Sequence, residues 1–557
     1  MSARPASRGA PAAPIPPLVW ALAALALVAW IATLGYRDLI HPDEGRYAEI
    51  AREMVASGDW VSPRLNGLLY FEKPALQYWA TAIGFELFGA NAFAARLWPG
   101  LTSAAAVLAL WLVAHARLGA RAGAIAACAL GGSVWWIANG HFLNLDMGLA
   151  FFTTLALLGF WHAQRDGASP GQTRAGMWVA WGAMACAVLS KGLIGALLPG
   201  AVLAIWSVLA RDLGVWRRMH WGSGLAIFFA IAAPWFVVVS ARNPDFARFF
   251  FVHEHFERFL TTQHRRVGAW WYFVPVLALG AMPWTTLLPG ALARALRREP
   301  GRFQLNRLML VWAVFVFAFF SASGSKLPSY ILPMFPALAV LLARHVDAMP
   351  PARLSWHAGA SAALALAGVA ALLVPPDQMA RGSSAPRELE LAYRDWIVAG
   401  LATVAAGALV AVFAARRGAT LAAVAALAFA SLAGTQVVML GHQTLAPLKS
   451  ARVMVESLRG RIDPSAPFYS VGTYDQSLAF YLGRPVTLVA WVDEFATGIR
   501  IEPQRQVPTL DAFERLWRAQ PGAVALMARE GYERFERAGL PMRVVYRDVQ
   551  RVVVVRP

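Results

Sequence analysis

The chain is poor in cysteine and in charge. Its two cysteines, Cys128 and Cys186, both lie inside hydrophobic segments, so neither indicates a structural disulfide or a thiolate metal site. Only 15% of the 557 residues are charged and 58% are hydrophobic, and the mean hydropathy of +0.49 argues against a set of soluble domains. No cleavable signal pattern precedes the first hydrophobic segment, Leu18 to about Leu34, so we expect an uncleaved first helix.

Thirteen hydrophobic runs come close to the ~20 residues that a membrane-spanning helix needs. They lie at 18–35, 92–113, 122–139, 147–162, 176–190, 193–210, 222–240, 270–290, 307–322, 329–344, 355–375, 395–415 and 420–440. A further run at 74–89 begins at Pro74, is short and carries Gln77 and Glu86, which is typical of an interfacial helix. The pattern predicts a polytopic α-helical membrane protein with interfacial juxtamembrane helices.

The basic residues of the short loops divide unequally between the two sides of the membrane. If the N-terminus is cytoplasmic, most loop arginines fall on its side, and the opposite short loops hold only Lys191, Lys326, Arg381, Arg387 and Arg394. This topology accounts for most of the net charge of +18, which could otherwise suggest nucleic acid or anionic lipid as a partner. It predicts a disordered cytoplasmic N-terminus at 1–17, a transmembrane domain at 18–440 with its first outer loop at 36–91, and an outer domain at 441–557.

The last part of the chain is no longer membrane-like. Short β-rich runs alternate with helical patterns after residue 441, which predicts a small α/β domain. The expected strands are 468–471, 486–489, 524–527, 542–546 and 549–555, and the expected helices are 476–482, 510–519 and 532–538.

The stretch 41–74 is densely charged although it lies between hydrophobic segments. From Asp43 to Ser57 its apolar residues recur at helical spacing, which predicts an amphipathic helix along the membrane interface. Asp43 is an expected N-cap of this helix and Gly58 its expected stop. The helix would hold Asp43 at the membrane surface.

Five polar clusters are expected at the outer face, as a single site would require. They are the 41–74 loop, HFLNLD (141–146), SKG (190–192), the loop 241–266 and SGSKLPSY (323–330). Asp43 and Asp146 are candidate catalytic carboxylates, and for both the alternative is a helix cap. Either carboxylate could act as a base or could stabilise cationic charge.

Several residues of these clusters could hold a phosphate or a metal. Lys73 and Lys326 can each hold a phosphate as a point charge. The alternative for Lys73 is a solvated ion pair with Glu72, and the alternative for Lys326 is contact with lipid headgroups. The guanidinium of Arg258 is well shaped for phosphate, although Arg258 could instead support a local helix. His253, and Glu72, could ligate a metal, but the spacing around His253 is not diagnostic. Together with Tyr330, these residues suggest chemistry on a lipid phosphate.

At these residues the sequence resembles a known family. HPDEGRYAEIAREMVASGDWVSPRLNGLLYFEKP, followed by LQYW and FGANAFAARL, is similar to the bacterial aminoarabinose transferases of lipid A, and SGSKLPSYILPMFPALA matches a second family stretch. These are GT-C type, polyprenyl-phosphate-dependent glycosyltransferases related to protein O-mannosyltransferases. The resemblance is close in the first loop and extends in layout to about residue 345, whereas the tail compares only by position.

The resemblance implies a fold, an activity and roles for individual residues. The implied fold has thirteen membrane helices, juxtamembrane helices and a C-terminal periplasmic α/β domain. Asp43 matches the essential carboxylate, and Lys73 and Arg258 match the residues that bind the carrier phosphate, which Tyr330, Lys326 and Arg46 would join. From its place at the start of a span, and not from the resemblance, Asp146 is the candidate for a second catalytic carboxylate. Glu72 and His253 match candidate ligands of a divalent ion such as zinc, with a structural role.

The implied reaction moves 4-amino-4-deoxy-L-arabinose from undecaprenyl phosphate to a lipid A phosphate, at the periplasmic face of the bacterial inner membrane. It would confer resistance to polymyxin and other cationic peptides, and we expect a monomer. One alternative is the same fold transferring another polyprenyl-linked sugar to a hydroxyl of a glycan, lipid or protein, which would need a true base. Another is a non-enzymatic lipid-binding or translocating protein, which would be expected to place polar residues near the midplane. No Gly-rich nucleotide loop is present, which argues against a nucleotide-sugar donor.

Overall fold

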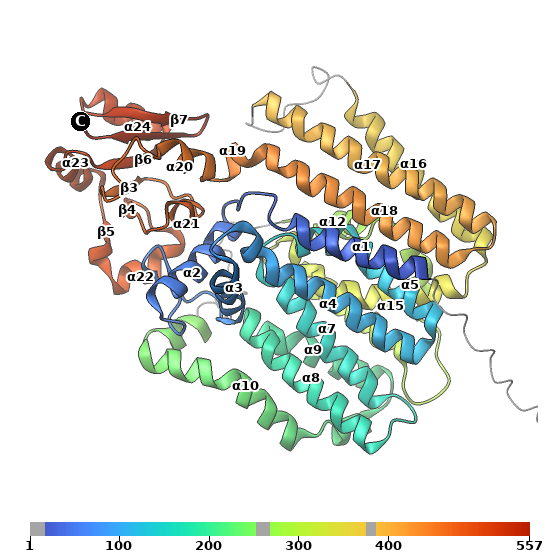
Figure 1. The fold of residues 1–557 in the computed structure, drawn as a ribbon. Helices are drawn as coiled ribbons and strands as arrows, with labels where there is room; N and C mark the ends of the chain where they lie inside the picture. The colour runs from blue at the N-terminus through green and yellow to red at the C-terminus, as the bar shows by residue number, and fades with distance from the viewer. Residues whose placement is uncertain (1–16, 252–267, 375–385) are drawn as a thin grey trace, which may run out of the picture.

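The computed structural model describes residues 17–251, 268–374 and 386–557. A helical bundle makes up most of the molecule, and a small α/β domain, orange to red in Figure 1, lies at one end of it beside helices α2 and α3. The fold is that of a multi-pass membrane protein with a C-terminal sheet domain, as the sequence predicts.

Each predicted span coincides with a helix or with consecutive helical segments. These are α1 (Pro17–Thr33), α4 (Ala92–Leu118), α5 (Ala120–Gly131) with α6 (Val134–Gly140), α7 (Leu145–Gln164), α8 (Pro170–Lys191), α9 (Ile194–Leu209), α10 (Trp221–Arg242), α12 (Phe273–Gly280) with α13 (Leu288–Ala295), α14 (Leu305–Ala322), η4 (Pro328–Met334) with α15 (Phe335–Asp347), α16 (Pro351–Leu372), α17 (Arg387–Arg416) and α18 (Thr420–Gly441). Within the described residues, seven helices are long and apolar enough to cross a membrane, or nine if each of two bent pairs is one span. The number thirteen stays a prediction.

The first loop contains two helices and a short hairpin. Helix α2 (Asp43–Ser57) has the predicted bounds and ends at Gly58, whose φ of 70° is left-handed and whose N–H donates to Met54 O. The prediction that Asp43 is the N-cap was wrong, because Pro42 occupies that position and Asp43 is the first helical residue. Helix α3 (Leu76–Phe88) has 13 residues, too few to span, and packs on α2 and α4. Strands β1 (Arg64–Leu65) and β2 (Leu68–Leu69) form the hairpin.

The polar face of α2 is covered by protein. Arg46, Glu49 and Glu53 are buried together with the apolar residues of the helix. Residues Tyr47 and Ile50 share one apolar cluster with residues of the C-terminal sheet. The amphipathic pattern is therefore satisfied by two partners, the membrane-side helices and the C-terminal domain, and not by a lipid surface and solvent alone.

The C-terminal domain is built on a six-stranded mixed sheet in the order β5-β4-β3-β6-β8-β7. The strands are β3 (Phe468–Val471), β4 (Thr487–Val489), β5 (Gln506–Val507), β6 (Val524–Ala528), β7 (Arg543–Arg547) and β8 (Arg551–Val555), and the helices among them are α21 (Leu478–Leu482), α22 (Ala496–Ile501), α23 (Leu510–Ala519) and α24 (Arg529–Arg537). One face of the sheet packs on α23 and α24, and the other belongs to the apolar cluster of α2. All five predicted strands and all three predicted helices are present, whereas the two-residue β5 and helix α22 were missed.

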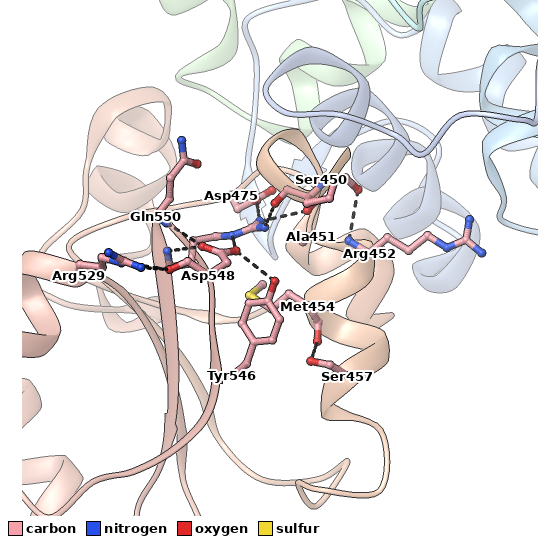
Figure 2. A network of polar contacts seen from close by, with 12 residues as sticks. Ser450, Ala451, Arg452, Met454, Ser457, Asp475, Arg529, Tyr546, Asp548 and Gln550 are labelled. Carbon is pink, nitrogen blue, oxygen red and sulfur yellow. Dashed lines mark hydrogen bonds and ion pairs between the residues drawn. The ribbon is translucent and has the colours of Figure 1, made fainter. Parts of the chain in front are cut away.

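Arg551 fastens this domain to the end of the membrane domain. Its guanidinium donates to Asp475 Oδ2 and Asp548 Oδ2, both at 2.8 Å, and to the carbonyl of Ser450 at 3.1 Å (Figure 2). A further bond of 2.7 Å reaches the carbonyl of Pro447. The arginine therefore joins strand β8, the loop before α21 and the segment with α19 (Ala446–Lys449) and α20 (Arg452–Leu458).

Glu44 fixes the first turn of α2 to the membrane domain. Both of its carboxylate oxygens accept from Arg96 of α4 at 2.7 Å, and one also accepts from the backbone N–H of Leu143 at 3.1 Å. Both side chains are almost fully buried. Burial would raise the pKa of Glu44, but Arg96 outweighs it and lowers the pKa below its ordinary value.

Removing the guanidinium of Arg96 should destabilise the whole protein. In Arg96→Met the Glu44 carboxylate stays buried without its cation, a loss of about 3–5 kcal/mol. We expect a lower thermal midpoint or little folded protein in detergent by size-exclusion chromatography. The matched control is Arg121→Met, because Arg121 pairs with Asp347 at 3.0 Å on the surface and such pairs contribute about 0–1 kcal/mol. Equal midpoints for the two variants would contradict the assigned role of Arg96.

Glu53 should make the stability of the protein depend on pH. Burial and the nearby Glu49 raise the pKa of Glu53 from 4.5 to about 8. The folded state therefore holds this proton more tightly than the unfolded chain, and stability should fall as pH rises from about 4.5 to about 8. We expect the thermal midpoint of Glu53→Gln to fall less over this window than that of the wild type. Glu456→Gln, at an exposed carboxylate, should follow the wild type, and parallel curves for all three proteins would contradict the shift.

Candidate active site

Asp43 lies in a chain of polar contacts that extends into the C-terminal domain. Its Oδ1 accepts from Arg46 Nη1 at 2.9 Å, and Arg46 Nη2 pairs with Glu494, which follows strand β4. The other oxygen of Glu494 accepts from Gln476 Nε2 at 3.0 Å. The Asp43 side chain is 38% exposed, whereas those of Arg46 and Glu494 are buried. Asp43 is therefore the one carboxylate of this cluster that an external ligand can reach.

Buried tyrosines lie beside this cluster. Burial is the largest cause of the raised pKa values of Tyr47 and Tyr70, and the charge of Glu72 adds to it in both. Burial also raises the pKa of Glu494, against the opposing effect of Arg46, and Glu72 contributes to this shift too. Tyr47 and Tyr70 also belong to one apolar cluster, so the FEKP segment that follows Tyr70 lies near helix α2.

Lys73 points back to its own neighbour. Its Nζ donates to the carbonyl of Glu72 at 2.8 Å, and the side chain is half-buried. This contact orients the ammonium group at the FEKP segment. The predicted role of Lys73 in binding a carrier phosphate stays a prediction.

Asp146 forms a second cluster with two other predicted polar loops. It lies in the first turn of α7, whose N-cap is Asn144, and it pairs with Lys191 at the end of α8. Its Oδ2 accepts from Ser329 Oγ at 2.9 Å. The Lys191 ammonium lies 4.5 Å from the centre of the Tyr330 ring, a cation–π contact. Asp146 and Tyr330 are thus brought together through Lys191.

Glu44 connects the two clusters. It precedes Arg46 by two positions on α2, and its bond to the N–H of Leu143 holds the loop that leads into α7. The segments that carry Asp43 and Asp146 are therefore both held by the buried carboxylate of Glu44. The structure supports the prediction that these loops lie at one face.

Lys326 is buried beneath this face. Its Nζ donates to the carbonyls of Ser321 and Ser323 at 2.7 and 2.8 Å, where helix α14 ends. Burial lowers the pKa of this ammonium. The position favours a positive charge at the carboxyl end of a helix, and the predicted contact with a carrier phosphate stays a prediction.

Two predicted residues, Arg258 and His253, lie outside the described residues. Glu72 is consequently the one predicted metal ligand that can be placed. In the part of the chain that is described, no group of three or more His, Cys, Asp and Glu side chains could hold a metal ion. Metal binding stays a prediction.

Sequence reasoning missed the partners that orient the predicted residues. Arg96, Glu494 and Gln476 had no assigned role, and Lys191 was named only as part of a polar cluster. Glu494 contacts Arg46 across 448 residues of sequence, and nothing in the local pattern around it marks it. For Lys191 a signal was available, since a lysine directly after an apolar run at the outer face needs an anionic partner.

Comparisons with known proteins agree with the fold. Residues 454–556 match the model of the aminoarabinose transferase C-terminal domain, and residues 18–250 match that of the dolichyl-phosphate-mannose-protein mannosyltransferases. The crystal structure of ArnT from Cupriavidus metallidurans bound to undecaprenyl phosphate superposes with a TM-score of 0.92, at 38% identity over 97% of this chain and 98% of that chain. Its apo structure gives a TM-score of 0.91 over the same shares.

The sequence alignments with curated relatives cover a smaller part of this chain than the structural superposition does. The undecaprenyl phosphate-α-4-amino-4-deoxy-L-arabinose arabinosyl transferase of Edwardsiella ictaluri is 36% identical over 58% of this chain and 59% of its own length. The enzyme of the same name from Pseudomonas aeruginosa PAO1 is 37% identical over 56% of each chain. The aligned segment thus spans somewhat more than half the length of these relatives, while the structural similarity extends over nearly the whole chain. The chain belongs to the aminoarabinose transferase (ArnT) family of GT-C type membrane proteins.

Proposed function

We propose that this protein transfers 4-amino-4-deoxy-L-arabinose from undecaprenyl phosphate to a phosphate group of lipid A. The observation that carries the proposal is its similarity, over 97% of the chain, to an ArnT that was crystallised with undecaprenyl phosphate. The names of the curated relatives support the same donor. The site would face the periplasm from the inner membrane, and the protein would act as a monomer.

The proposed reaction exchanges one bond at the anomeric carbon of the sugar. An oxygen of the acceptor phosphate attacks this carbon, and the bond to the carrier phosphate breaks, so that undecaprenyl phosphate leaves with the electron pair. The acceptor is already anionic and the leaving group is a phosphate, so neither a strong base nor an acid is required. The protein has to hold both phosphates and to stabilise the positive charge that develops on the sugar.

Asp43 fits the part of this task that needs negative charge. Its carboxylate is accessible and has its position set by Arg46 at 2.9 Å. It would hold the ammonium of the aminosugar or stabilise oxocarbenium-like charge. Asp146 would be the second carboxylate, which keeps Lys191 in place beside Tyr330.

Cationic groups would hold the departing phosphate. Lys73, Arg258 and Tyr330 are the residues proposed for this role, together with Lys326 at the end of α14. A divalent ion bound by Glu72 and His253 would stabilise the local fold. Adding a cationic sugar to lipid A offsets phosphate charge, so the reaction should weaken the binding of polymyxin.

The proposed activity can be tested on lipid A itself. We expect a host that lacks its own aminoarabinose transferase, but supplies the donor, to gain lipid A heavier by one aminopentose when it expresses this protein. The change Asp43→Asn should abolish this mass increase and polymyxin survival, because the carboxylate charge is lost. The matched control is Asp245→Asn, at an exposed carboxylate 3.5 Å from Arg500, which should behave as wild type. No added aminopentose from well-expressed wild-type protein would favour another sugar or acceptor.

The role of Lys73 can be tested by donor binding. Lys73→Ala should weaken the affinity for undecaprenyl phosphate about 10- to 100-fold, the loss of one charge-assisted hydrogen bond to a phosphate. Binding can be measured with purified protein in nanodiscs. Lys449→Ala removes an exposed lysine and should leave the affinity unchanged. An unchanged affinity in Lys73→Ala would remove Lys73 from the carrier site.

A further inference from the structure

We propose that Glu494 of the C-terminal domain is a positioning residue for Asp43 and shares Arg46 with it, so that the arginine does not fully neutralise the charge that Asp43 presents to the substrate. The inference rests on the proposed function, because it gives Asp43 a cationic partner on the sugar. It assigns the C-terminal domain a part in the reaction, beyond covering the membrane domain.

The C-terminal domain touches α2 at the residues next to Asp43. Gly45 packs directly on the segment that precedes α21, and a Cβ at this position would lie only 2.5 Å from the backbone N of Ser477. Only glycine permits this approach, because the obstructing atoms are backbone. Gln476, in the same segment, holds Glu494. The domain therefore packs its backbone against Gly45 of α2 and forms an ion pair with the next residue, Arg46.

Arg46 transmits the position of Glu494 to Asp43. One terminal nitrogen of its guanidinium pairs with Glu494 and the other with Asp43. A planar guanidinium held at one edge has its other edge fixed as well, so the orientation of Asp43 depends on Glu494. Arg46 was predicted to bind the carrier phosphate, but in this arrangement it acts on the carboxylates.

The charge balance of the three groups explains why two carboxylates share one arginine. A single Arg46–Asp43 pair would be close to neutral and would attract a cationic sugar weakly. With Glu494 added, the three groups carry one net negative charge, and the accessible member is Asp43. Glu494 and Arg46 are buried, so this charge can be met only at Asp43.

The first experiment measures kinetics and donor binding separately in full-length protein. In Glu494→Gln the size of the side chain is kept and its charge is lost, so we expect kcat to fall about 10- to 100-fold, as for a displaced catalytic group. The affinity for undecaprenyl phosphate, which carries no sugar, should stay within about twofold, because one net charge at Asp43 does not alter the carrier phosphate contacts. Glu494→Asp should recover part of the lost kcat.

The matched control is Glu502→Gln. Glu502 also joins the C-terminal domain to the first loop, through Arg64 at 2.9 Å, but it contacts neither Arg46 nor Asp43. Its variant should keep the wild-type kcat. If both variants lose kcat equally, or if Glu494→Gln also loses affinity for undecaprenyl phosphate, the effect is domain docking and the inference is wrong.

A double mutant tests the route through Arg46. If Glu494 acts through this arginine, Arg46→Met combined with Glu494→Gln should lose no more kcat than Arg46→Met alone. Additive losses would overturn the inference. Wild-type protein that transfers no aminopentose would refute the proposed function and this inference with it, whereas active wild type with an unaffected Glu494→Gln refutes the inference alone.

Discussion

The buried pair of Glu44 and Arg96 is the interaction on which the position of the first loop depends. It joins α2 to α4 through two bonds of 2.7 Å, and a third bond holds the loop before α7. A buried carboxylate with this many donors has few alternative positions, because every displacement would leave a charge unpaired. The helix that begins at Asp43 is thereby anchored at its first turn to the membrane domain.

The C-terminal domain also holds helix α2 in place. The hydrophobic pattern of α2 accounts for one side of the helix, yet its polar side is also buried, because loop 475–477 and Glu494 lie on it. The domain in turn is fastened by Arg551, which bonds to the segment that leaves the last membrane helix (Figure 2). Helix α2 is thus held between the membrane domain and the C-terminal domain, and Asp43 lies where these two domains meet.

Features that depend on neighbouring residues could be predicted from the sequence, whereas contacts between distant residues could not. The bounds of α2 and of most strands could be predicted, since helical and alternating periodicity and a left-handed Gly58 depend on neighbouring residues. The N-cap was misassigned because an aspartate at the first helical position has the same local pattern as a cap. The pairing of Arg46 with Glu494 could not be predicted, because a lone arginine near a phosphate-binding motif also fits a phosphate. Only the three-dimensional arrangement shows this pairing.

The two candidate carboxylates each pair with one cation, but only Asp43 shares its cation with a second carboxylate. Asp146 has its own partner, Lys191, and a hydroxyl donor, and is itself buried, so its charge is neutralised where it lies. Asp43 shares Arg46 with Glu494 and remains accessible. An unneutralised carboxylate attracts a cationic sugar, whereas a neutralised one does not. Under the proposed function, Asp43 is therefore suited to meet the sugar, and Asp146 to organise the phosphate side of the site. The two aspartates therefore differ in their electrostatic surroundings, because Asp146 pairs with Lys191 whereas Asp43 shares Arg46 with Glu494.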